Sequence, residues 1–453
     1  MVKFERVILI TVDCLRADHV GCISGGNLTP NIDKFAENSI VFTRAFANGP
    51  GTNQSFPAIL TSTYFLVHEG LRLNPYCVTL AEVLRSNGFK TVAFHSNPFL
   101  SKIFGWDRGF DEFYDFMNVT KGPSAFVARK QKGKITKMLM RFVGSVLGAS
   151  YSAKIQRLLK KAYYKFSGLR IPYLEGSELN KYVIEWFKKN KEKRFFLWVH
   201  YMDPHDPYVP PEEYLPSNFA SRDEAFEYNL AINTDKPSKE DLAILKRLYE
   251  GEVKYVDTCI CELIHFLEDK GFVDDSLMIF TADHGHAFME HGRFAHAYDI
   301  LYNEVTHVPL IIHGVGKAKI DTFVQLLDLP PTVLDLLGIN CPPTFMGRSL
   351  LKKMKGPSII FSESAKPDLI NLRYDVSKKA ISCIKDEYKF ILNQLRGTME
   401  LYNLEKDFQE INDLSEKEKE LCSNMLSLIE KHLLHESTFK TKIKLLKTIG
   451  KAR

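Results

Sequence analysis

The feature that most constrains the fold is a series of short apolar segments, rich in β-branched residues, that recur along the chain. They are RVILITVD, FKTVAFHS, RFFLWVHYMD, SLMIFTADHG and HVPLIIHG. Unbroken apolar runs of this length are typical of strands that are buried on both faces. Stretches with helical periodicity, such as TPNIDKFAENS and TLAEVLRSNG, separate the first two segments. The alternation predicts an α/β fold with a mostly parallel central sheet sandwiched by helices.

Three of these segments end in side chains that can bind a metal. Asp13 ends the first, Asp283 and His284 end the fourth, and His205 follows Asp203 after the third. Ligands of such sheets bind beyond the carboxyl ends of the strands, so we expect these groups to lie together. Carboxylates and imidazoles are ligands of divalent cations. An Asp-His pair before glycine is by itself more often a turn with a helix cap, and only its neighbours favour a metal site.

The pattern changes after LLGINCPPTFMGRSLL, where the strand candidates become shorter: SIIFSES, KKAISCIKD and YKFILNQ. These segments predict a small C-terminal antiparallel sheet. We therefore divide the chain into a catalytic α/β domain at 1–352, an α+β subdomain at 353–430 and a basic tail at 431–453.

Positive charge is concentrated in one segment. Thirteen Lys and Arg, with no Asp or Glu, fall between Phe116 and Leu174, although the net charge of the chain is only +5. Two interpretations of this basic helical insert stay open. It forms helices that pack on the core and expose a basic face, or it lies on an anionic membrane.

Cysteine usage and apolar content suggest a compartment. The eight cysteines are scattered and are expected to be reduced thiols. The N-terminal apolar run is too short for a signal peptide, and no window has the length of a spanning helix. We expect a cytoplasmic protein, with peripheral contact at the inner membrane face as an extension of the basic-insert hypothesis.

Eight passages carry a resemblance to a known family. They are ILITVDCLRADHVG, TPNIDKFAENSIVFTRAFAN, GFDEFYDF, LWVHYMDPHDPYVPP, FTADHGHAFMEHGRFAH, LYNEVTHVPLIIHG, LLDLPPTVLDLLGINCPPTFMGRSLL and MELYNLEKDFQEINDL. In this order they resemble the sulfatase family of the alkaline phosphatase superfamily over nearly the whole chain. The resemblance implies the fold, dependence on a divalent metal and ester hydrolysis.

The expected nucleophile departs from the family pattern. Sulfatases use a formylglycine made from the Cys or Ser of a C/S-x-P-x-R motif, which the resemblance aligns with Thr52, Gln54 and Phe56. All three positions differ. A formylglycine hydrate expels sulfate with its second hydroxyl, which threonine lacks, so an intermediate on Thr52 must be cleared by water attacking the transferred group. Threonine and serine members that handle phosphate use that route.

The remaining site residues also follow from resemblance, in this case to the phosphoethanolamine and lipoteichoic-acid transferases, which carry Glu in place of Asp13. The candidate metal ligands are Asp13, Thr52, Asp283 and His284. The candidate catalytic residues are Thr52, which would form a phosphothreonine, and His205 and His296, which would bind the non-bridging oxygens or protonate the leaving group.

Four further residues lie in or near the same motifs. Cys14 stands where many sulfatases have a second metal-binding aspartate, which favours Mn²⁺ or Zn²⁺ and leaves Ca²⁺ as a further candidate. A small buried residue is the simpler interpretation of Cys14. His286 replaces the usual glutamate, His291 is interpreted as structural, and Arg293 is expected to pair with surface acids.

The leading hypothesis is a metal-dependent hydrolase of phosphate mono- or diesters, or a phosphotransferase, with a covalent Thr52 intermediate. The alternatives are a sulfatase that uses unmodified threonine and an inactive module that binds polyanions. The expected substrate is a small-molecule, lipid-linked or glycan-linked phosphate or sulfate ester, and no nucleic acid is expected. The sequence leaves the oligomeric state open.

Overall fold

The computed structural model describes most of the chain. The described residues are 4–68, 70–117, 173–232, 236–351, 359–368 and 373–450. The predicted basic insert falls almost entirely on 118–172, outside the described residues. Among the described residues, no helix combines the length and the apolarity needed to cross a bilayer.

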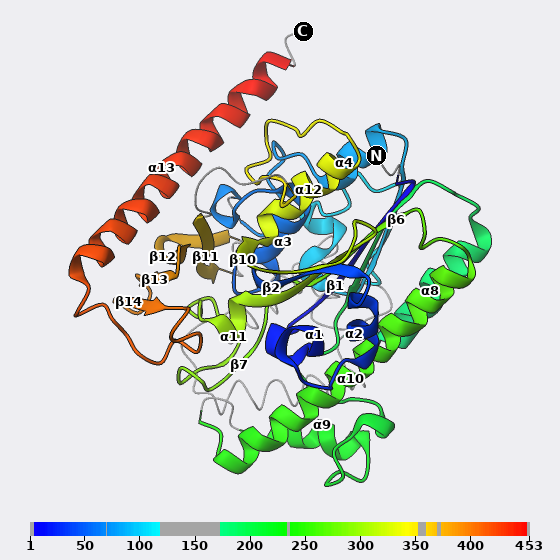
Figure 1. Ribbon diagram of the computed structural model, residues 1–453, viewed down its shortest axis with the longest axis horizontal. Helices are drawn as coiled ribbons and strands as arrows, with labels where there is room; N and C mark the ends of the chain where they lie inside the picture. Colours follow the sequence, from blue (N-terminus) through cyan, green and yellow to red (C-terminus); the bar gives the residue numbers. More distant parts are fainter. Residues whose placement is uncertain are drawn as a thin grey trace, which may run out of the picture.

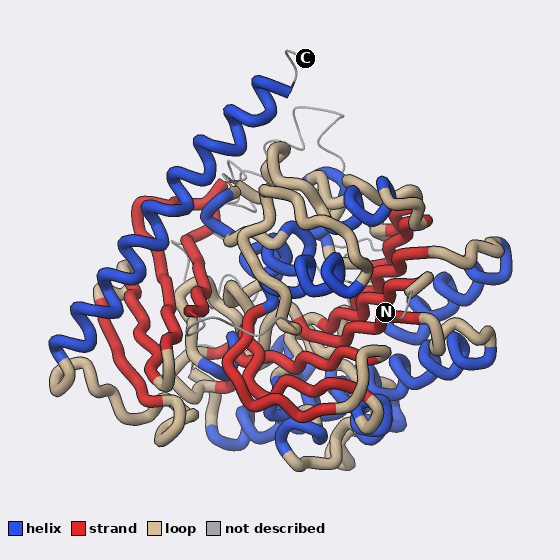
Figure 2. The backbone as a smooth tube through the Cα atoms, turned by 45° about the horizontal axis from the view of Figure 1, so that its top comes forward, coloured by secondary structure: helices blue, strands red, loops and turns tan. Residues whose placement is uncertain are grey.

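An eight-stranded sheet forms the centre of the molecule (Figures 1 and 2). Its strands are β1 (Arg6–Val12), β2 (Ser39–Phe46), β3 (Lys90–His95), β4 (Glu112–Tyr114), β5 (Phe195–Tyr201), β6 (Ser276–Ala282), β9 (His307–His313) and β10 (Ala318–Gln325). The strand order is β10-β2-β9-β6-β1-β5-β3-β4. Strand β9 is antiparallel to both of its neighbours, and every other pairing is parallel.

Strand β1 shows why the apolar segments become central strands. All seven of its residues are buried, and it pairs in parallel with β5 on one side and β6 on the other. Leu9 lies opposite Trp198 and Ile279 in the two registers. A strand with paired edges and two covered faces has no position for a solvated side chain, which explains the unbroken apolar run.

Helices cover both faces of the sheet, as Figures 1 and 2 show. The longer ones are α2 (Pro30–Ala36), α3 (Thr52–Thr61), α4 (Leu80–Ser86), α8 (Gly176–Lys189), α9 (Arg222–Ala231), α10 (Lys239–Asp269) and α12 (Leu329–Leu336). Helix α10 packs against α2 and α8 on one face, and α3 packs against α4 and α12 on the other. The predicted sandwich of helices around a mostly parallel sheet is confirmed.

Short elements connect these layers. They are the helices α1 (Gly21–Ser24) and α11 (Asn303–Thr306), the 3₁₀ helices η1 (Ala17–His19), η2 (Phe65–Val67), η3 (Pro98–Leu100), η4 (Lys102–Phe104), η6 (Glu212–Tyr214) and η7 (Leu326–Asp328), and the strands β7 (Ala287–Phe288) and β8 (Phe294–Ala295). Strands β7 and β8 form a two-stranded antiparallel ribbon.

The predicted C-terminal sheet is also present. Its four antiparallel strands are β11 (Ile359–Asp368), β12 (Arg373–Lys385), β13 (Tyr388–Asn393) and β14 (Thr398–Asn403). Helix α13 (Lys419–Gly450) runs along the outside of this sheet and contacts β12, β13 and η2 (Figure 1). The helix continues through the predicted boundary at residue 430, and the division into domains stays a prediction.

One buried histidine lies just after η2. The Thr63 hydroxyl is 2.9 Å from Nε2 of His68, and the Asn74 backbone N–H donates to Nδ1 over 2.9 Å. Burial lowers the pKa of His68 to about 3, so the imidazole is neutral in the folded protein. A neutral ring is also what the Asn74 hydrogen bond requires, because that bond needs an acceptor at Nδ1.

Candidate active site

Adjacent strand ends place two carboxylates side by side. Asp13 follows β1 and Asp283 follows β6, and both side chains are fully buried. The backbone N–H of Asp13 donates to Tyr201 O over 2.9 Å, and that of Asp283 donates to Val12 O over 3.3 Å. The sheet ladder thus continues past the last paired residues and fixes both aspartates at its carboxyl edge, as the sequence predicts.

His284 completes this group. Its Nε2 lies 3.5 Å from Asp13 Oδ1 and 3.5 Å from Asp283 Oδ2. Its Nδ1 lies 2.9 Å from the backbone carbonyl of Gly285, a contact that places the ring proton on Nδ1. The lone pair of Nε2 therefore faces the two carboxylates, which is the tautomer that a metal-binding histidine adopts.

Thr52 lies at the first position of α3, directly after the loop that follows β2. Its hydroxyl donates to Asp13 Oδ2 over 3.4 Å. The Asn97 amide, at the end of β3, donates to Asp13 Oδ2 over 2.8 Å and to Thr52 Oγ1 over 3.3 Å. The helix N-terminus adds its positive dipole end at the same point, a setting that favours anions.

Two residues of this site were missed in the sequence. Asn97 is one, and its available signal was its position just after the β3 segment FKTVAFHS. His200, inside β5, is the other: Thr11 Oγ1 contacts its Nδ1 at 3.0 Å, and its Nε2 points to Asp13 Oδ2 at 3.5 Å. A histidine in the apolar run FFLWVHY was the only signal for it.

The buried polar atoms of this group test whether it fits a metal. Four of them have no hydrogen-bond partner among the described residues: Asp13 Oδ1, His200 Nε2, Asp283 Oδ2 and His284 Nε2. Ligand atoms of Asp13, His200 and Asp283 lie within 4.8 Å of one another, as do those of Asp13, Cys14 and His284. Unpaired carboxylate and imidazole atoms that converge in a buried site are the donor set of a divalent cation.

The charges of the two aspartates agree with this fit. Burial alone would raise the pKa of Asp13, but the neighbouring His205 and His200 hold it well below its usual range. Burial and the charge of Asp13 raise the pKa of Asp283 well above its usual range. Two neighbouring buried carboxylates cannot both stay ionised unless a cation lies between them, and otherwise one of them takes up a proton.

The ribbon of β7 and β8 returns the chain to the site and brings His296 beside His284, with ring centroids 4.6 Å apart. The ring centroids of His205 and His296 are 5.1 Å apart. Cys14 Sγ is 3.5 Å from His296 Nδ1, and Cys14 has a left-handed backbone with φ 60°. Burial lowers the pKa of His296, so its ring is neutral and open to hydrogen bonding. The structure therefore brings together all six predicted site residues.

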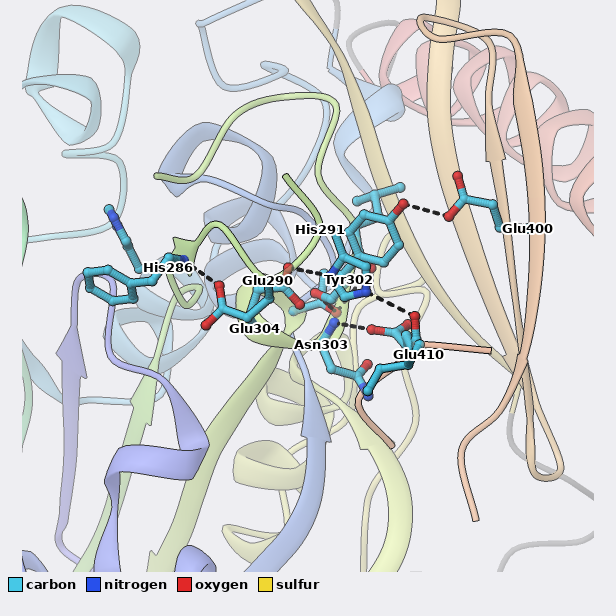
Figure 3. Close-up of polar contacts among 12 residues, drawn as sticks. His286, Glu290, His291, Tyr302, Asn303, Glu304, Glu400 and Glu410 are labelled. Atoms are coloured by element: carbon cyan, nitrogen blue, oxygen red, sulfur yellow. Dashed lines mark hydrogen bonds and ion pairs between the residues drawn. The ribbon is translucent and has the colours of Figure 1, made fainter. Parts of the chain in front are cut away.

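The other histidines of these loops lie in different contacts. His286 is buried against the Tyr208 hydroxyl, 2.7 Å from its Nε2, and burial lowers its pKa to about 3. His291 contacts Glu304 Oε1 at 2.8 Å through Nδ1 and the Glu410 carbonyl at 2.9 Å through Nε2 (Figure 3). Arg293 pairs with Asp299 at 3.0 Å. The contacts of His291 agree with its structural interpretation. Arg293 pairs with an acid as expected, but Asp299 is buried and not on the surface.

The contacts of His291 belong to a larger polar network at the boundary with the C-terminal sheet (Figure 3). Glu410 accepts the Asn303 N–H, and its Oε1 lies 2.8 Å from the ammonium of Lys389. Lys389 and Glu410 are both essentially inaccessible to solvent. Lys389 also donates to Asn303 Oδ1 over 2.8 Å and approaches Thr306 Oγ1 at 3.3 Å. The buried ion pair joins β13 to the segment after β14, and the hydrogen bonds of both residues to Asn303 connect them to α11.

Two family models match the chain. Residues 5–339 match the model described as Sulfatase, and residues 289–438 match the one described as N-sulphoglucosamine sulphohydrolase, C-terminal. The chain belongs to the sulfatase family. The first match includes every site residue described above, and the second includes the small C-terminal sheet. A sulfatase-family protein is an ester hydrolase of the alkaline phosphatase superfamily.

Relatives support this assignment over long stretches. The arylsulfatase of Clostridium perfringens (strain 13 / Type A) is 25% identical over 94% of each chain. The multifunctional alkaline phosphatase superfamily protein PehA of Trinickia caryophylli is 22% identical over 77% of this chain and 76% of its own.

Solved structures share the fold. The phosphonate monoester hydrolase of Agrobacterium radiobacter has a TM-score of 0.66 at 19% identity and covers 96% of each chain. BT1596, a 2-O GAG sulfatase, has a TM-score of 0.69 at 17% identity, covering 96% of this chain and 93% of its own.

Proposed function

We propose that this sulfatase-family protein is a metal-dependent hydrolase of phosphate mono- or diesters that uses Thr52, unmodified, as its nucleophile. The observation that carries the proposal is the position of Thr52 Oγ1. The hydroxyl lies at a helix N-terminus, within hydrogen-bond distance of Asp13 and Asn97. A threonine has one hydroxyl, so a group bound to it leaves only when water attacks the group itself. That step suits phosphorus, and it is the reason for preferring phosphate over sulfate.

The reaction has two displacements. Thr52 Oγ1 attacks phosphorus, its proton leaves along the hydrogen bond to Asp13 Oδ2, and the bond from phosphorus to the leaving oxygen breaks. His205 and His296 are partly accessible beside the buried group. His205 protonates that oxygen, and His296, whose ring is neutral, binds a non-bridging oxygen. Water then attacks phosphorus on the opposite side and gives a proton to His205. The bond from phosphorus to Thr52 Oγ1 breaks, and Asp13 returns its proton to the hydroxyl.

The metal would be held by Asp13, Asp283 and His284, with Thr52 Oγ1 as a fourth ligand. A divalent cation supplies positive charge that lowers the pKa of a nearby hydroxyl and neutralises an anionic ester. Asn97 orients both the Thr52 hydroxyl and the Asp13 carboxylate. The nitrogen and sulfur donors of His284, His200 and Cys14 favour Mn²⁺ or Zn²⁺ over Ca²⁺, which prefers oxygen alone.

A sulfuric ester hydrolase is the second candidate. It is favoured by the family match and by neighbours whose names give sulfatase activity, including a 2-O GAG sulfatase. A sulfated glycan is therefore the competing substrate class, and the same residues would act on it. The two candidates differ in the transferred group, since Thr52 has no second hydroxyl for the elimination that formylglycine performs.

The proposal is tested by comparing turnover of three substrates in the presence of Mn²⁺ or Zn²⁺. They are nitrophenyl phosphate, bis-nitrophenyl phosphate and nitrophenyl sulfate. We expect the phosphate esters to turn over faster, and faster sulfate turnover would overturn the preference. Thr52→Ala should lower kcat more than about 10⁴-fold while bound metal is retained. Asp13→Asn and Asp283→Asn should lose metal as well as turnover.

Ser55→Ala is the matched control on the same helix. The Ser55 hydroxyl is buried and has no hydrogen-bond partner among the described residues, so its loss should leave turnover within a few-fold of wild type. Activity that survives in Thr52→Ala and disappears in Ser55→Ala would assign the nucleophile to Ser55 instead.

A further inference from the structure

A second cluster of ligand-type side chains lies between the C-terminal sheet and helix α13. It consists of Glu363 on β11 and of His432 and Glu436 on α13. Their exposed fractions are 0%, 7% and 2%. One ligand atom from each of the three lies within 4.8 Å of the other two. None of these residues belongs to the candidate active site.

The imidazole of His432 is held in a fixed orientation. Its ring stacks on Phe361 with centroids 3.9 Å apart and planes 6° apart, and it meets the Tyr64 ring edge-on at 4.5 Å. Its Nε2 lies 2.5 Å from Glu363 Oε1. His432 and Glu436 are four residues apart on one helix, so both side chains project from the same face toward Glu363.

Glu363 is fixed from the opposite side. Its Oε2 accepts the backbone N–H of Leu66 over 2.9 Å, and its own N–H donates to the Asn48 carbonyl over 2.9 Å. Asn48 precedes α3 and Leu66 follows it. Oε1 of Glu363 is thereby left to face His432 and α13.

One carboxylate oxygen of the cluster lacks a hydrogen-bond partner among the described residues. It is the buried Oε1 of Glu436. A carboxylate without a partner in a buried site is costly unless it gains a proton or a cation.

We propose that Glu363, His432 and Glu436 bind a divalent transition metal, with Zn²⁺ as the fitting ion, at a second site separate from the active site. One imidazole nitrogen and two carboxylate oxygens are ligands that zinc accepts in a four-coordinate site, the fourth being water. The dication balances the two carboxylates and gives the buried Oε1 of Glu436 a partner. The bound metal joins α13 to β11, and through Glu363 to the segments on either side of α3.

The proposed site is tested in a variant that lacks the two aspartates of the active site. The full chain carrying Asp13→Asn and Asp283→Asn is stripped with chelator, supplied with Zn²⁺ and analysed for zinc per chain and for Tm. We expect one zinc per chain and a Tm rise of about 3 °C when Zn²⁺ is 100-fold above its Kd. Glu436→Gln or His432→Gln in the same background should abolish both effects. Glu430→Gln, an exposed position on the same helix, should change neither.

The alternative is a proton shared between the two glutamates. In that case the background variant binds no zinc, its Tm does not respond to Zn²⁺, and Glu436→Gln leaves the Tm unchanged or higher, results that would overturn the proposal. Because both readouts are taken without the active-site aspartates, they do not depend on the proposed esterase activity. Loss of turnover in Thr52→Ala tests that activity separately.

Discussion

Replacement of Asn97 by alanine should show how far the active site depends on a residue that touches both its nucleophile and its first carboxylate. The change removes two donated hydrogen bonds, to Asp13 Oδ2 at 2.8 Å and to Thr52 Oγ1 at 3.3 Å. It also removes the acceptor for the Phe99 N–H, at 2.9 Å, which caps η3. The first two losses act on catalysis, and the third acts on stability.

The shorter of the two catalytic hydrogen bonds, to Asp13 Oδ2, sets the size of the expected loss in kcat/KM. A hydrogen bond to a charged group contributes about 1.5–3 kcal/mol, which corresponds to roughly 10- to 150-fold in kcat/KM when the bond positions reacting groups. The measurement is nitrophenol release from nitrophenyl phosphate at saturating metal. Asn97→Asp keeps the acceptor for Phe99 but directs a third carboxylate at Asp13, so it should bind metal more tightly and react more slowly than wild type, because added negative charge repels an anionic ester.

Asn87→Ala is the matched control. It also loses one side-chain hydrogen bond to the backbone, from Nδ2 to Val83 O over 2.9 Å in α4, and has no contact with the site. It should lower Tm slightly and leave kcat/KM unchanged. If Asn97→Ala stayed within about threefold of wild type, Asn97 would be only a cap of η3, and the positioning argument would be wrong.

Four further outcomes are expected. Lys389→Met leaves the Glu410 carboxylate buried and unpaired, so urea unfolding should show a loss of about 3–5 kcal/mol, and adding Glu410→Met should restore most of it; a stable single variant would contradict this. Because the pKa of His68 is about 3 when folded and 6.5 when unfolded, only the unfolded chain binds its proton between these values, so this one group should lower the free energy of unfolding by up to about 1.4 kcal/mol per pH unit as pH drops from 6.5 toward 3. His68→Gln should reduce that slope by about one proton, and an unchanged slope would refute the assignment. Co-expression with a formylglycine-generating enzyme should leave the peptide 48–64 at its unmodified mass, and a modified residue there would disprove direct use of threonine. The protein should sediment with anionic but not neutral vesicles and lose this binding when 129–165 is replaced by a Gly/Ser linker; no sedimentation with anionic vesicles would exclude the membrane hypothesis.

The parts of the site that the sequence predicts are those encoded locally. An apolar run that ends in an acid marks both a buried strand and its carboxyl end, so Asp13 and Asp283 are visible without knowledge of the fold. His284 is visible for the same reason, because it is adjacent in the chain. The positions of Thr52 and His296 came from resemblance, since nothing in their own spacing shows that α3 and the β7–β8 ribbon end at the same edge.

The parts that escaped prediction depend on strand order. His200 lies inside β5, and a lone histidine in an apolar strand is more often a core residue than a ligand. Asn97 precedes a proline and is easily interpreted as a turn residue. His200 and Asn97 reach the site because β5 lies between β1 and β3 in the sheet. That order is set by strand pairing and cannot be seen in the sequence. The reversed direction of β9 was hidden too, since HVPLIIHG has the same apolar character as the parallel strands.

The pairing of β1 also has a consequence for how the protein is made. Arg6 pairs with Phe195 on one side and with Ser276 on the other, so the strand is synthesised about 190 and 270 residues before its two neighbours. At 5–20 residues per second, the ribosome takes roughly 13–54 s to deliver the second neighbour. Throughout that interval an apolar segment of high β-propensity has at least one unpaired edge, which is the condition for aggregation. We therefore expect nascent chains that stop before Ser276 to depend on chaperones, and the second carboxylate of the site to join the first only after β6 has been made.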